Sequence, residues 1–268
     1  MTSPPAFSLP RPALQLPRIM GHRGAKALAP ENTLSSMKAA AAAGATWVEF
    51  DVMLTADGEP VLFHDDTLQR TTGITGAMAK TPFATVRSLD ASLGFARRYG
   101  VRKGQGFAGR PDCRVPSLED TVACLLDLGL TPNVEIKPTT GLAVETAEVA
   151  LTRLLALWPQ GRLPPLVSSF ERASLAAARR VAPQWPRGLL AEVFPADWRR
   201  AMAELDCASL HLDWQRTRRA DVAAVKAAGY AFAVYTVNGV RAGRRLLAKG
   251  VDCLITDRPD LLIPALDG

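Results

Sequence analysis

Short apolar runs alternate with longer amphipathic stretches along most of this chain. The runs are bounded by turn or helix signals, which is typical of buried strands. The expected strands cover residues 18–22, 46–54, 132–137, 165–170, 187–193, 207–212, 230–237 and 252–256. The stretches between them have helical spacing and predict helices over residues 32–43, 117–128, 142–157, 171–181, 196–204, 218–228 and 239–248, with a last short helix after Pro259. The pattern therefore predicts an α/β fold with a parallel sheet.

Several of these elements carry their own end signals. The helix over residues 32–43 is preceded by Pro30-Glu31-Asn32-Thr33 and followed by Gly44, in agreement with helix capping preferences. Ser117 has the position of an N-cap for the helix over residues 117–128. Ala56-Asp57-Gly58 predicts a turn, after which residues 60–64 return as a short strand.

The alternation amounts to about eight strand–helix units, which predicts a TIM (β/α)8 barrel. A chain of 268 residues suits this fold, because such barrels typically run to roughly 250 residues. The alternative is an open doubly wound sheet, which usually carries a glycine-rich phosphate loop after its first strand. That position holds His22-Arg23-Gly24 here, which favours the barrel.

Two segments depart from the rhythm. Residues 1–17 are rich in proline and predict an irregular N-terminal arm. Residues 65–115 are rich in Thr, Gly, Arg and Lys, with only short helical hints near residues 82–88. A segment this long between elements is usually functional, so we expect a lid or small subdomain there. The catalytic barrel is then expected to span residues 18–268.

Composition narrows the function classes. The net charge is +6, but the arginines are scattered and aromatic residues make up only 6%, which speaks against nucleic-acid binding. The four cysteines lack CxxC spacing, so a zinc or redox site is not expected. The sequence shows neither a signal peptide nor an apolar run long enough to span a membrane. We therefore expect a cytoplasmic protein without stable membrane insertion, and the pattern predicts no particular oligomeric state.

Two of the three histidines stand at the ends of apolar runs. His22 ends the first expected strand, and His64 ends the return strand after the turn. Imidazole is the side chain best suited to proton transfer near neutral pH. Between them Glu49 and Asp51 lie two positions apart in a strand, so both point to the same face. The pattern indicates an acid/base pair beside a metal.

Glu135 and Lys137 repeat this spacing on the next expected barrel strand. Side chains at the carboxyl ends of barrel strands build the active site of a TIM barrel. Three carboxylates, from Glu49, Asp51 and Glu135, suit Mg²⁺ or Ca²⁺ better than zinc. Lys137 is placed to meet an anionic group such as a phosphate. The alternatives are a solvent-facing pair at Glu49 and Asp51 and a surface ion pair between Glu135 and Lys137.

Other polar residues also fall at expected strand ends. Ser168 and Ser169 lack a nucleophile-elbow sequence and are more typical of groups that satisfy the backbone. His211 is interpreted as a pocket-lining or hydrogen-bonded histidine. Glu192, Asp213, Thr236, Asn238 and Asp257 also stand at or near strand ends.

The order and spacing of these short motifs resemble the glycerophosphodiester phosphodiesterases over about residues 19 to 263. The matching motifs are His22-Arg23-Gly24, Pro30-Glu31-Asn32-Thr33, Glu49-Phe50-Asp51-Val52, Asp57-Gly58-Glu59-Pro60-Val61, His64-Asp65, Pro116-Ser117-Leu118-Glu119, Glu135-Ile136-Lys137, Ser168-Ser169-Phe170, Thr236-Val237-Asn238 and Thr256-Asp257-Arg258-Pro259. The resemblance is to the bacterial cytosolic form of this family.

The resemblance implies a TIM barrel with a small subdomain inserted after the second strand, which accounts for residues 65–115. It implies hydrolysis of small glycerophosphodiesters to sn-glycerol 3-phosphate and an alcohol, with a divalent metal (Mg²⁺ or Ca²⁺) as cofactor. The roles that it implies are metal binding by Glu49, Asp51 and Glu135, acid/base catalysis by His22 and His64, and phosphate contacts from Arg23 and Lys137. We expect Ser169, His211 and Tyr235 to contact the substrate. Tyr235 stands where this family often has tryptophan, which puts the shape of the glycerol pocket in question.

Two other functions fit the same sequence less well. A lysophospholipase D or a phospholipase C-like phosphodiesterase would use the same barrel, with an apolar rim near the site. The segment 65–115 offers Phe83, Phe95 and Phe107 for such a rim, but also many charges. The position of two histidines at strand ends speaks against a basic barrel that only binds a partner. The first nucleophile, either water or the glycerol 2-hydroxyl, is left open.

Overall fold

The strands form a closed barrel in the computed structural model, which describes residues 14–100 and 106–267. Nine strands form one sheet in the described residues, in the order β1-β9-β8-β7-β6-β5-β4-β2-β3, and β1 pairs with β2 to close the ring through Gly21 and Val48. All neighbours are parallel except β2 and β3. Their bounds are β1 (Ile19–Gly21), β2 (Trp47–Leu54), β3 (Pro60–Leu62), β4 (Thr131–Ile136), β5 (Leu166–Ser169), β6 (Arg187–Ala191), β7 (Ser209–Asp213), β8 (Ala231–Tyr235) and β9 (Cys253–Thr256). The predicted (β/α)8 barrel is thereby confirmed, and the open doubly wound sheet is excluded, because β1 has a neighbour on both sides.

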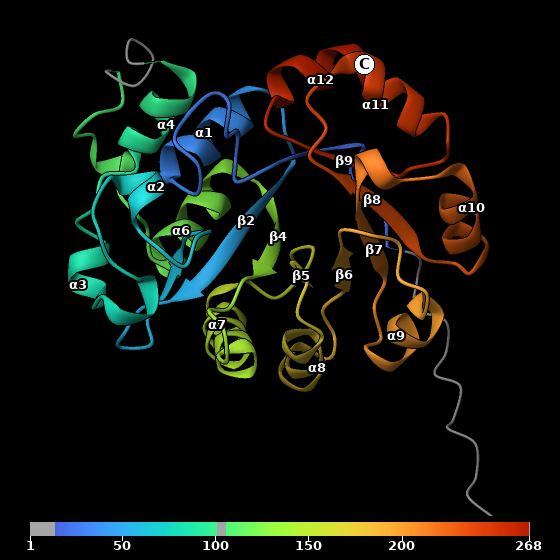
Figure 1. Cartoon of the computed structure of the whole chain (residues 1–268), viewed down its shortest axis with the longest axis horizontal. Coiled ribbons are helices and arrows are strands. Elements are labelled where there is room, and N and C mark those ends of the chain that lie inside the picture. The colour runs from blue at the N-terminus through green and yellow to red at the C-terminus, as the bar shows by residue number, and fades with distance from the viewer. Residues whose placement is uncertain (1–13, 101–105, 268) are drawn as a thin grey trace, which may run out of the picture.

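Helices surround the barrel on its outside (Figure 1). They are α1 (Leu34–Ala42), α6 (Leu118–Leu128), α7 (Ala143–Leu157), α8 (Arg172–Val181), α9 (Trp198–Glu204), α10 (Arg219–Ala227), α11 (Val240–Leu247) and α12 (Pro259–Leu266), with a short 3-10 helix η3 (Trp214–Arg216) after β7. The starts of α1 and α6 have side-chain caps. Thr33 accepts a hydrogen bond from the Ser36 amide at the start of α1, and Ser117 accepts one from the Asp120 amide at the start of α6. In the described residues, no helix is long and apolar enough to cross a membrane.

Alternating strand side chains divide the interior into two regions. Those that point outward, such as Phe50 and Leu210, pack beneath the helices in two large apolar clusters. Those that point inward near the strand starts, such as Trp47, Leu166 and Cys253, form a separate apolar layer in the barrel. Further along the strands the inward positions become polar, and this change places the chemistry at the carboxyl ends.

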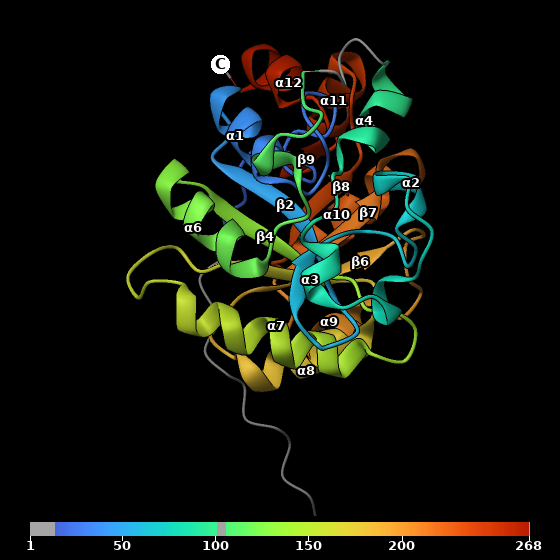
Figure 2. The same cartoon turned by 90° about the vertical axis from the view of Figure 1, so that its left-hand side faces the viewer.

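The segment over residues 65–115 packs against the outside of the β2–β3 hairpin. It contains α2 (Gln69–Thr72), η1 (Met78–Lys80), α3 (Phe83–Val86), α4 (Ser92–Tyr99) and η2 (Pro111–Cys113). Its own apolar cluster consists of Leu68, Met78, Val86 and Val115 on Met53, Val61 and Phe63. Figure 2 shows α2, α3 and α4 on one side of the barrel. The helical hint near residues 82–88 corresponds to α3, whereas α4 was not predicted.

The expected N-terminal arm is only partly covered by the structure. Residues 1–13 lie outside the described residues. Residues 14–17 have no regular secondary structure, and Leu14 and Leu16 pack against the apolar layer inside the barrel.

Candidate active site

Three buried carboxylates meet at the carboxyl ends of β2 and β4. Asp51 and Glu135 are register partners, and Glu49 lies two residues before Asp51 on the same face. One oxygen from each of the three carboxylates lies within 4.8 Å of the others. All three side chains are inside the barrel, with relative exposures of 3%, 1% and 8% for Glu49, Asp51 and Glu135. The predicted convergence of these carboxylates is therefore present, and neither pair lies at the solvent-facing surface.

The electrostatics of this cluster fit a divalent cation. Burial, together with the neighbouring carboxylates, raises the pKa of Glu49 well above its ordinary value and that of Glu135 to about 8. Burial opposes ionisation of Asp51 too, but Arg23 and His64 hold its pKa below the ordinary value. Glu49 Oε1 has no hydrogen-bond partner among the described residues. A hard cation with oxygen ligands relieves this crowding and uses the free oxygen.

His22 is held by a carboxylate from the last barrel strand. Its Nδ1 lies 2.6 Å from Asp257 Oδ1, and its Nε2 lies 3.9 Å from Glu49 Oε2. Asn238 holds Asp257 in turn, because its Nδ2 donates to Asp257 Oδ2 at 2.9 Å. Burial and the nearby Arg23 lower the pKa of His22. The ring is therefore neutral near neutral pH, and its Nε2 faces Glu49 of the carboxylate cluster.

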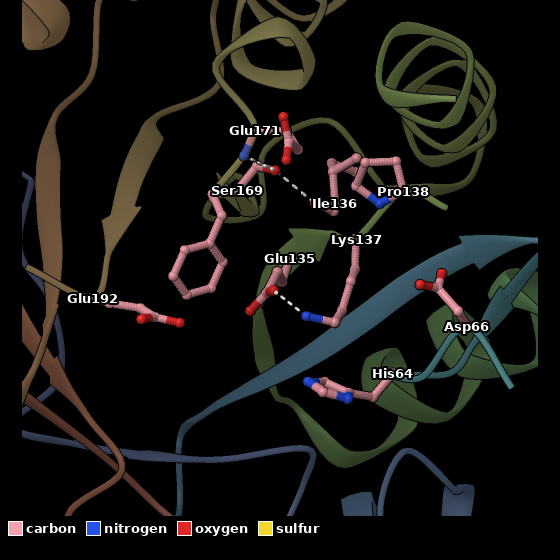
Figure 3. Close-up of a pocket in the computed structure, with 10 residues that line it drawn as sticks. His64, Asp66, Glu135, Ile136, Lys137, Pro138, Ser169, Glu171 and Glu192 are labelled. Carbon is pink, nitrogen blue, oxygen red and sulfur yellow. Dashed lines mark hydrogen bonds and ion pairs between the residues drawn. The ribbon is translucent and has the colours of Figure 1, made fainter. Parts of the chain in front are cut away.

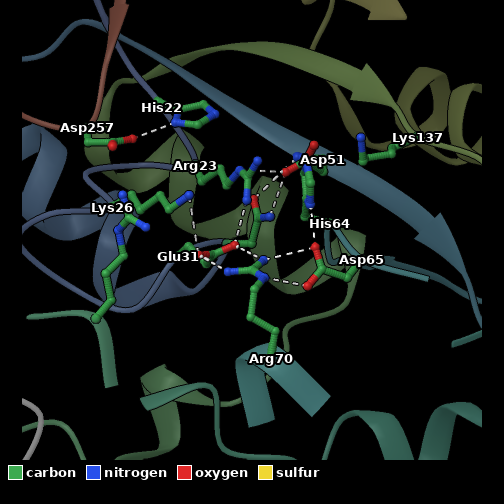
Figure 4. Close-up of polar contacts among 12 residues, drawn as sticks. His22, Arg23, Lys26, Glu31, Asp51, His64, Asp65, Arg70, Lys137 and Asp257 are labelled. Carbon is green, nitrogen blue, oxygen red and sulfur yellow. Dashed lines mark hydrogen bonds and ion pairs between the residues drawn. The ribbon is translucent and has the colours of Figure 1, made fainter. Parts of the chain in front are cut away.

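His64 is held in the same manner from the other direction. It follows β3, and its Nδ1 lies 2.6 Å from Asp65 Oδ1. Figure 4 shows the His22–Asp257 and His64–Asp65 pairs with Arg23 between them. A carboxylate on Nδ1 selects the tautomer that leaves Nε2 available for proton exchange.

Arg23 joins the first turn to the carboxylate cluster. Its backbone amide donates to Glu49 Oε2 at 2.9 Å, its Nε lies 3.2 Å from Asp51 Oδ2, and its Nη1 donates to Glu31 Oε1 at 2.7 Å. The φ of Arg23 is 49°, a left-handed conformation that aims the amide at Glu49. Asn32 donates from Nδ2 to Asp51 Oδ2 at 2.8 Å and so fixes the orientation of the Asp51 carboxylate.

Lys137 lies at the floor of a cavity of about 520 Å³ (Figure 3). Its Nζ is 3.7 Å from Glu135 Oε1 and 5.8 Å from the centre of the Phe170 ring. The cavity is lined by His64, Asp66, Glu135, Ile136, Lys137, Pro138, Ser169, Phe170, Glu171 and Glu192. Glu135, Lys137 and His64 thus face one cavity that is large enough for a small phosphodiester.

The three expected substrate contacts have different surroundings. Ser169 lines the cavity, but its hydroxyl donates to the Ile136 carbonyl and accepts from the Glu171 amide, so it satisfies the backbone. The Tyr235 hydroxyl donates to the Ala191 carbonyl at 2.8 Å, and its ring packs edge-on against the cavity residue Phe170.

His211 is not brought to the cavity. It is fully buried in the middle of β7, where its Nε2 lies 2.9 Å from Ser209 Oγ, and burial lowers its pKa to about 4. It stands in β7 opposite Leu190 of β6, two positions before the end of its strand. His211 is not among the residues that line the cavity.

Sequence patterns left several functional residues without a role. Asp257 and Asn238 were noticed only as polar residues near strand ends, and Glu31 and Asp65 only as parts of motifs. The signal available for Asp65 is its position next to a strand-end histidine. Arg70, which bonds both Glu31 and Asp65, carries no local sequence signal at all.

Comparisons with known proteins agree with this geometry. Residues 22–261 match the glycerophosphoryl diester phosphodiesterase family. A glycerophosphodiester phosphodiesterase of Caldanaerobacter subterraneus subsp. tengcongensis is 30% identical over 246 residues, which cover 91% of this chain and 96% of that protein. A phosphodiesterase of Oleispira antarctica, solved with the product sn-glycerol-3-phosphate, superposes with a TM-score of 0.86 at 37% identity, over 94% of this chain and 98% of that one.

Proposed function

The chain belongs to the glycerophosphoryl diester phosphodiesterase family and is an enzyme of that class; on this premise we propose that it hydrolyses glycerophosphodiesters to sn-glycerol 3-phosphate and an alcohol, with a divalent metal and with His22 and His64 as the acid/base pair. The observation that carries the proposal is the pairing of two carboxylate-held imidazoles with three buried metal-type carboxylates.

Glu49, Asp51 and Glu135 would hold the metal ion. When bound, Mg²⁺ or Ca²⁺ supplies positive charge to the phosphoryl oxygens and acidifies a neighbouring hydroxyl. Arg23 and Lys137 contribute further positive charge beside the cluster, where negative charge grows in the transition state. These two cations also orient the phosphate group between the histidines.

The two histidines divide the proton transfers. Because burial and Arg23 keep His22 neutral, its Nε2 accepts the proton of the attacking hydroxyl as the new P–O bond forms. His64, which lines the cavity, donates a proton from Nε2 to the leaving alkoxide as the old P–O bond breaks. Asp257 and Asp65 keep both rings in the tautomer that this exchange requires.

The attacking oxygen belongs either to water or to the glycerol 2-hydroxyl. Attack by the 2-hydroxyl first gives a cyclic phosphate, which water then opens to glycerol phosphate. Phosphorus NMR of a reaction in progress separates the two routes, because only the second shows a transient cyclic signal.

A lysophospholipid substrate fits this pocket less well. That alternative requires an apolar rim for an acyl chain. The cavity is instead lined by the exposed carboxylates of Asp66, Glu171 and Glu192, for which the structure shows no side-chain ion pair among the described residues. Figure 3 shows Glu192 and Asp66 on opposite sides of the cavity. Burying three unpaired carboxylates beneath an acyl chain would be costly, so a glycerol without an acyl chain is favoured on the phosphate.

The deciding experiment is an assay for glycerol 3-phosphate. The protein is incubated with glycerophosphocholine, with Mg²⁺ or Ca²⁺ and with EDTA, and lysophosphatidylcholine serves as the competing substrate. The proposal expects release of glycerol 3-phosphate that stops with EDTA and returns with metal. Choline release is measured in parallel, because a lysophospholipase D leaves the acylated glycerol on the phosphate and forms no glycerol 3-phosphate. Faster choline release from lysophosphatidylcholine than from glycerophosphocholine would instead support the lysophospholipase D alternative.

A further inference from the structure

Arg70 lies on α2, in the segment inserted after the hairpin, yet its guanidinium contacts two carboxylates of the active-site loops. It donates from Nε to Asp65 Oδ2 at 2.5 Å and from Nη2 to Asp65 Oδ1 at 3.1 Å. It donates from Nη1 to Glu31 Oε2 at 2.8 Å and from Nη2 to Glu31 Oε1 at 2.7 Å. The planar fork of arginine suits such a two-sided, bidentate contact, which lysine cannot reproduce.

Each of these carboxylates holds a residue of the proposed reaction. Asp65 accepts from His64 Nδ1, and Glu31 accepts from Arg23 Nη1. Arg70 is therefore one bond away from both, although it contacts neither ring nor guanidinium itself. The two bonded carboxylates come from different loops, 34 positions apart in the chain by the numbering.

The two carboxylates also need Arg70 in order to stay together. Both accept from the same nitrogen, Nη2, so their oxygens lie close to each other. Two ionised carboxylates at such a separation repel each other. Without Arg70, Glu31 would keep Arg23 and Lys26 as ion-pair partners, whereas Asp65 would keep only His64 among the described residues, so Asp65 is the carboxylate that would turn away. If Asp65 turned away, the Nδ1 of His64 would lose the acceptor that fixes its tautomer.

We propose that Arg70 is a positioning residue for the reaction: it holds Asp65 against His64 and Glu31 against Arg23. The inserted segment then completes the active site by supplying one guanidinium from outside the barrel. The inference rests on the proposed function, because Arg70 is assigned an effect only through His64 and Arg23.

The test compares Arg70→Ala and Arg70→Lys with the unchanged protein on glycerophosphocholine at saturating metal. We expect Arg70→Ala to lower kcat by about 10- to 100-fold, the range found when a group that orients a functional histidine is lost. We expect KM to change by less than about threefold, because Arg70 does not line the cavity beside the carboxylates. Arg70→Lys keeps the charge without the fork, so its kcat should fall between the two.

A double-mutant cycle shows whether Arg70 acts through Asp65. In an Asp65→Ala background, Arg70→Ala should add a much smaller loss of kcat than it causes alone, because the contact through which Arg70 orients His64 is already absent. Addition of guanidinium chloride at low millimolar concentration should raise kcat of Arg70→Ala and leave that of the unchanged protein as it was. Arg97→Ala is the matched control, since Arg97 lies on α4 of the same segment, is exposed, and has no ion pair shown among the described residues.

The outcomes separate a positioning role from a structural one. A kcat per folded molecule within about threefold of the unchanged protein in Arg70→Ala would overturn the inference, as would full additivity with Asp65→Ala. If Arg70→Ala does not fold, the decision falls to Arg70→Lys, and full kcat in that variant would overturn it. Absence of any glycerol 3-phosphate release by the unchanged protein would refute the proposed function instead.

Discussion

At the residue scale, the site contains the same pairing of a carboxylate with a histidine two times. A carboxylate lies 2.6 Å from the Nδ1 of each histidine, from Asp257 for His22 and from Asp65 for His64. The same contact fixes the orientation of the ring and leaves Nε2 available for the proposed proton exchange. The third histidine, His211, has a hydroxyl partner instead and lies deeper in the barrel.

Replacement of either paired histidine should remove turnover without removing the metal. We expect His22→Ala and His64→Ala each to lower kcat by about 10²- to 10⁴-fold, the usual contribution of a general acid or base. Calorimetric titration with Mg²⁺ or Ca²⁺ should show binding close to that of the unchanged protein. His211→Asn is the control, and it should retain kcat per folded molecule. Near-normal kcat in both alanine variants would contradict the assignment.

The pH profile should report the lowered pKa of His22. Activity is expected to fall as pH drops through a value below 6.5, because protonated His22 cannot accept a proton. The carboxylate of Asp257 raises the pKa of His22, so Asp257→Asn should move this acidic limb to still lower pH and also reduce kcat. The measurement is kcat/KM against pH at saturating metal. A limb that moves to higher pH in Asp257→Asn would contradict the role given to this pair.

At the element scale, the turn from β1 into α1 places the guanidinium of Arg23 beside Asp51 and the backbone amide of Arg23 on Glu49. Arg23 takes a left-handed conformation there, and Gly24 follows with a φ of 81°. A Cβ on Gly24 would lie 2.4 Å from Ser36 Oγ and 2.6 Å from the Ser36 backbone, so α1 packs directly on this turn. Both the packing of α1 and the conformation of the turn that carries Arg23 therefore require glycine at position 24.

Gly24→Ala should destabilise the protein by about 2 to 5 kcal/mol, from left-handed strain and from overlap with α1. Gly58→Ala is a matched control, because Gly58 has a φ of 77° but no atom within 4 Å of an added Cβ. It should cost only about 1 kcal/mol. Urea unfolding of both variants measures the difference, and equal losses would show that the contact with Ser36 does not matter.

The elements that sequence predicts well are those whose pattern is local. Buried strands and their capped helices follow from apolar spacing and from residues such as Thr33 and Ser117. Helix α4 was missed because Gly94 stands inside it, and glycine disfavours helices. The structure gives the reason: a Cβ at Gly94 would lie 2.8 Å from the backbone of Thr71, where α2 and α4 meet. The bonds of Arg70 were invisible for a similar reason, since they span 39 positions to Glu31.

At the scale of the whole molecule, the carboxylates of Glu49, Asp51 and Glu135 repel one another at the carboxyl ends of the barrel strands. Glu49 and Glu135 have pKa values above their ordinary value of 4.5 in the folded protein, so the folded state binds more protons than the unfolded state above that pH. Stability from these two groups is present at low pH and is lost as pH rises toward about 8. A divalent cation supplies the missing positive charge at any of these pH values.

The metal-free protein should therefore lose thermal stability between about pH 6.5 and pH 8, where the lowered pKa values of His22 and His211 no longer add stability as pH rises. Saturating Mg²⁺ or Ca²⁺ should raise Tm most at the upper end and flatten the dependence, because the ion binds the folded state. Differential scanning calorimetry with EDTA and with metal measures both. Glu135→Gln is the control, and it should weaken the pH dependence even without metal. A metal-free Tm that rises over this interval would contradict the crowding of the carboxylates.

His22 and the carboxylate that orients it are separated by 235 positions in the chain. Glu49, Asp51 and both histidines are therefore synthesised long before Asp257, which directly follows β9. Until that strand pairs with β1, the ring of His22 has no acceptor to set its tautomer, and the barrel is still an open sheet. If His22 acts as proposed, a nascent chain that still lacks β9 is expected to leave phosphodiesters intact, and hydrolysis is expected only after that strand has closed the ring.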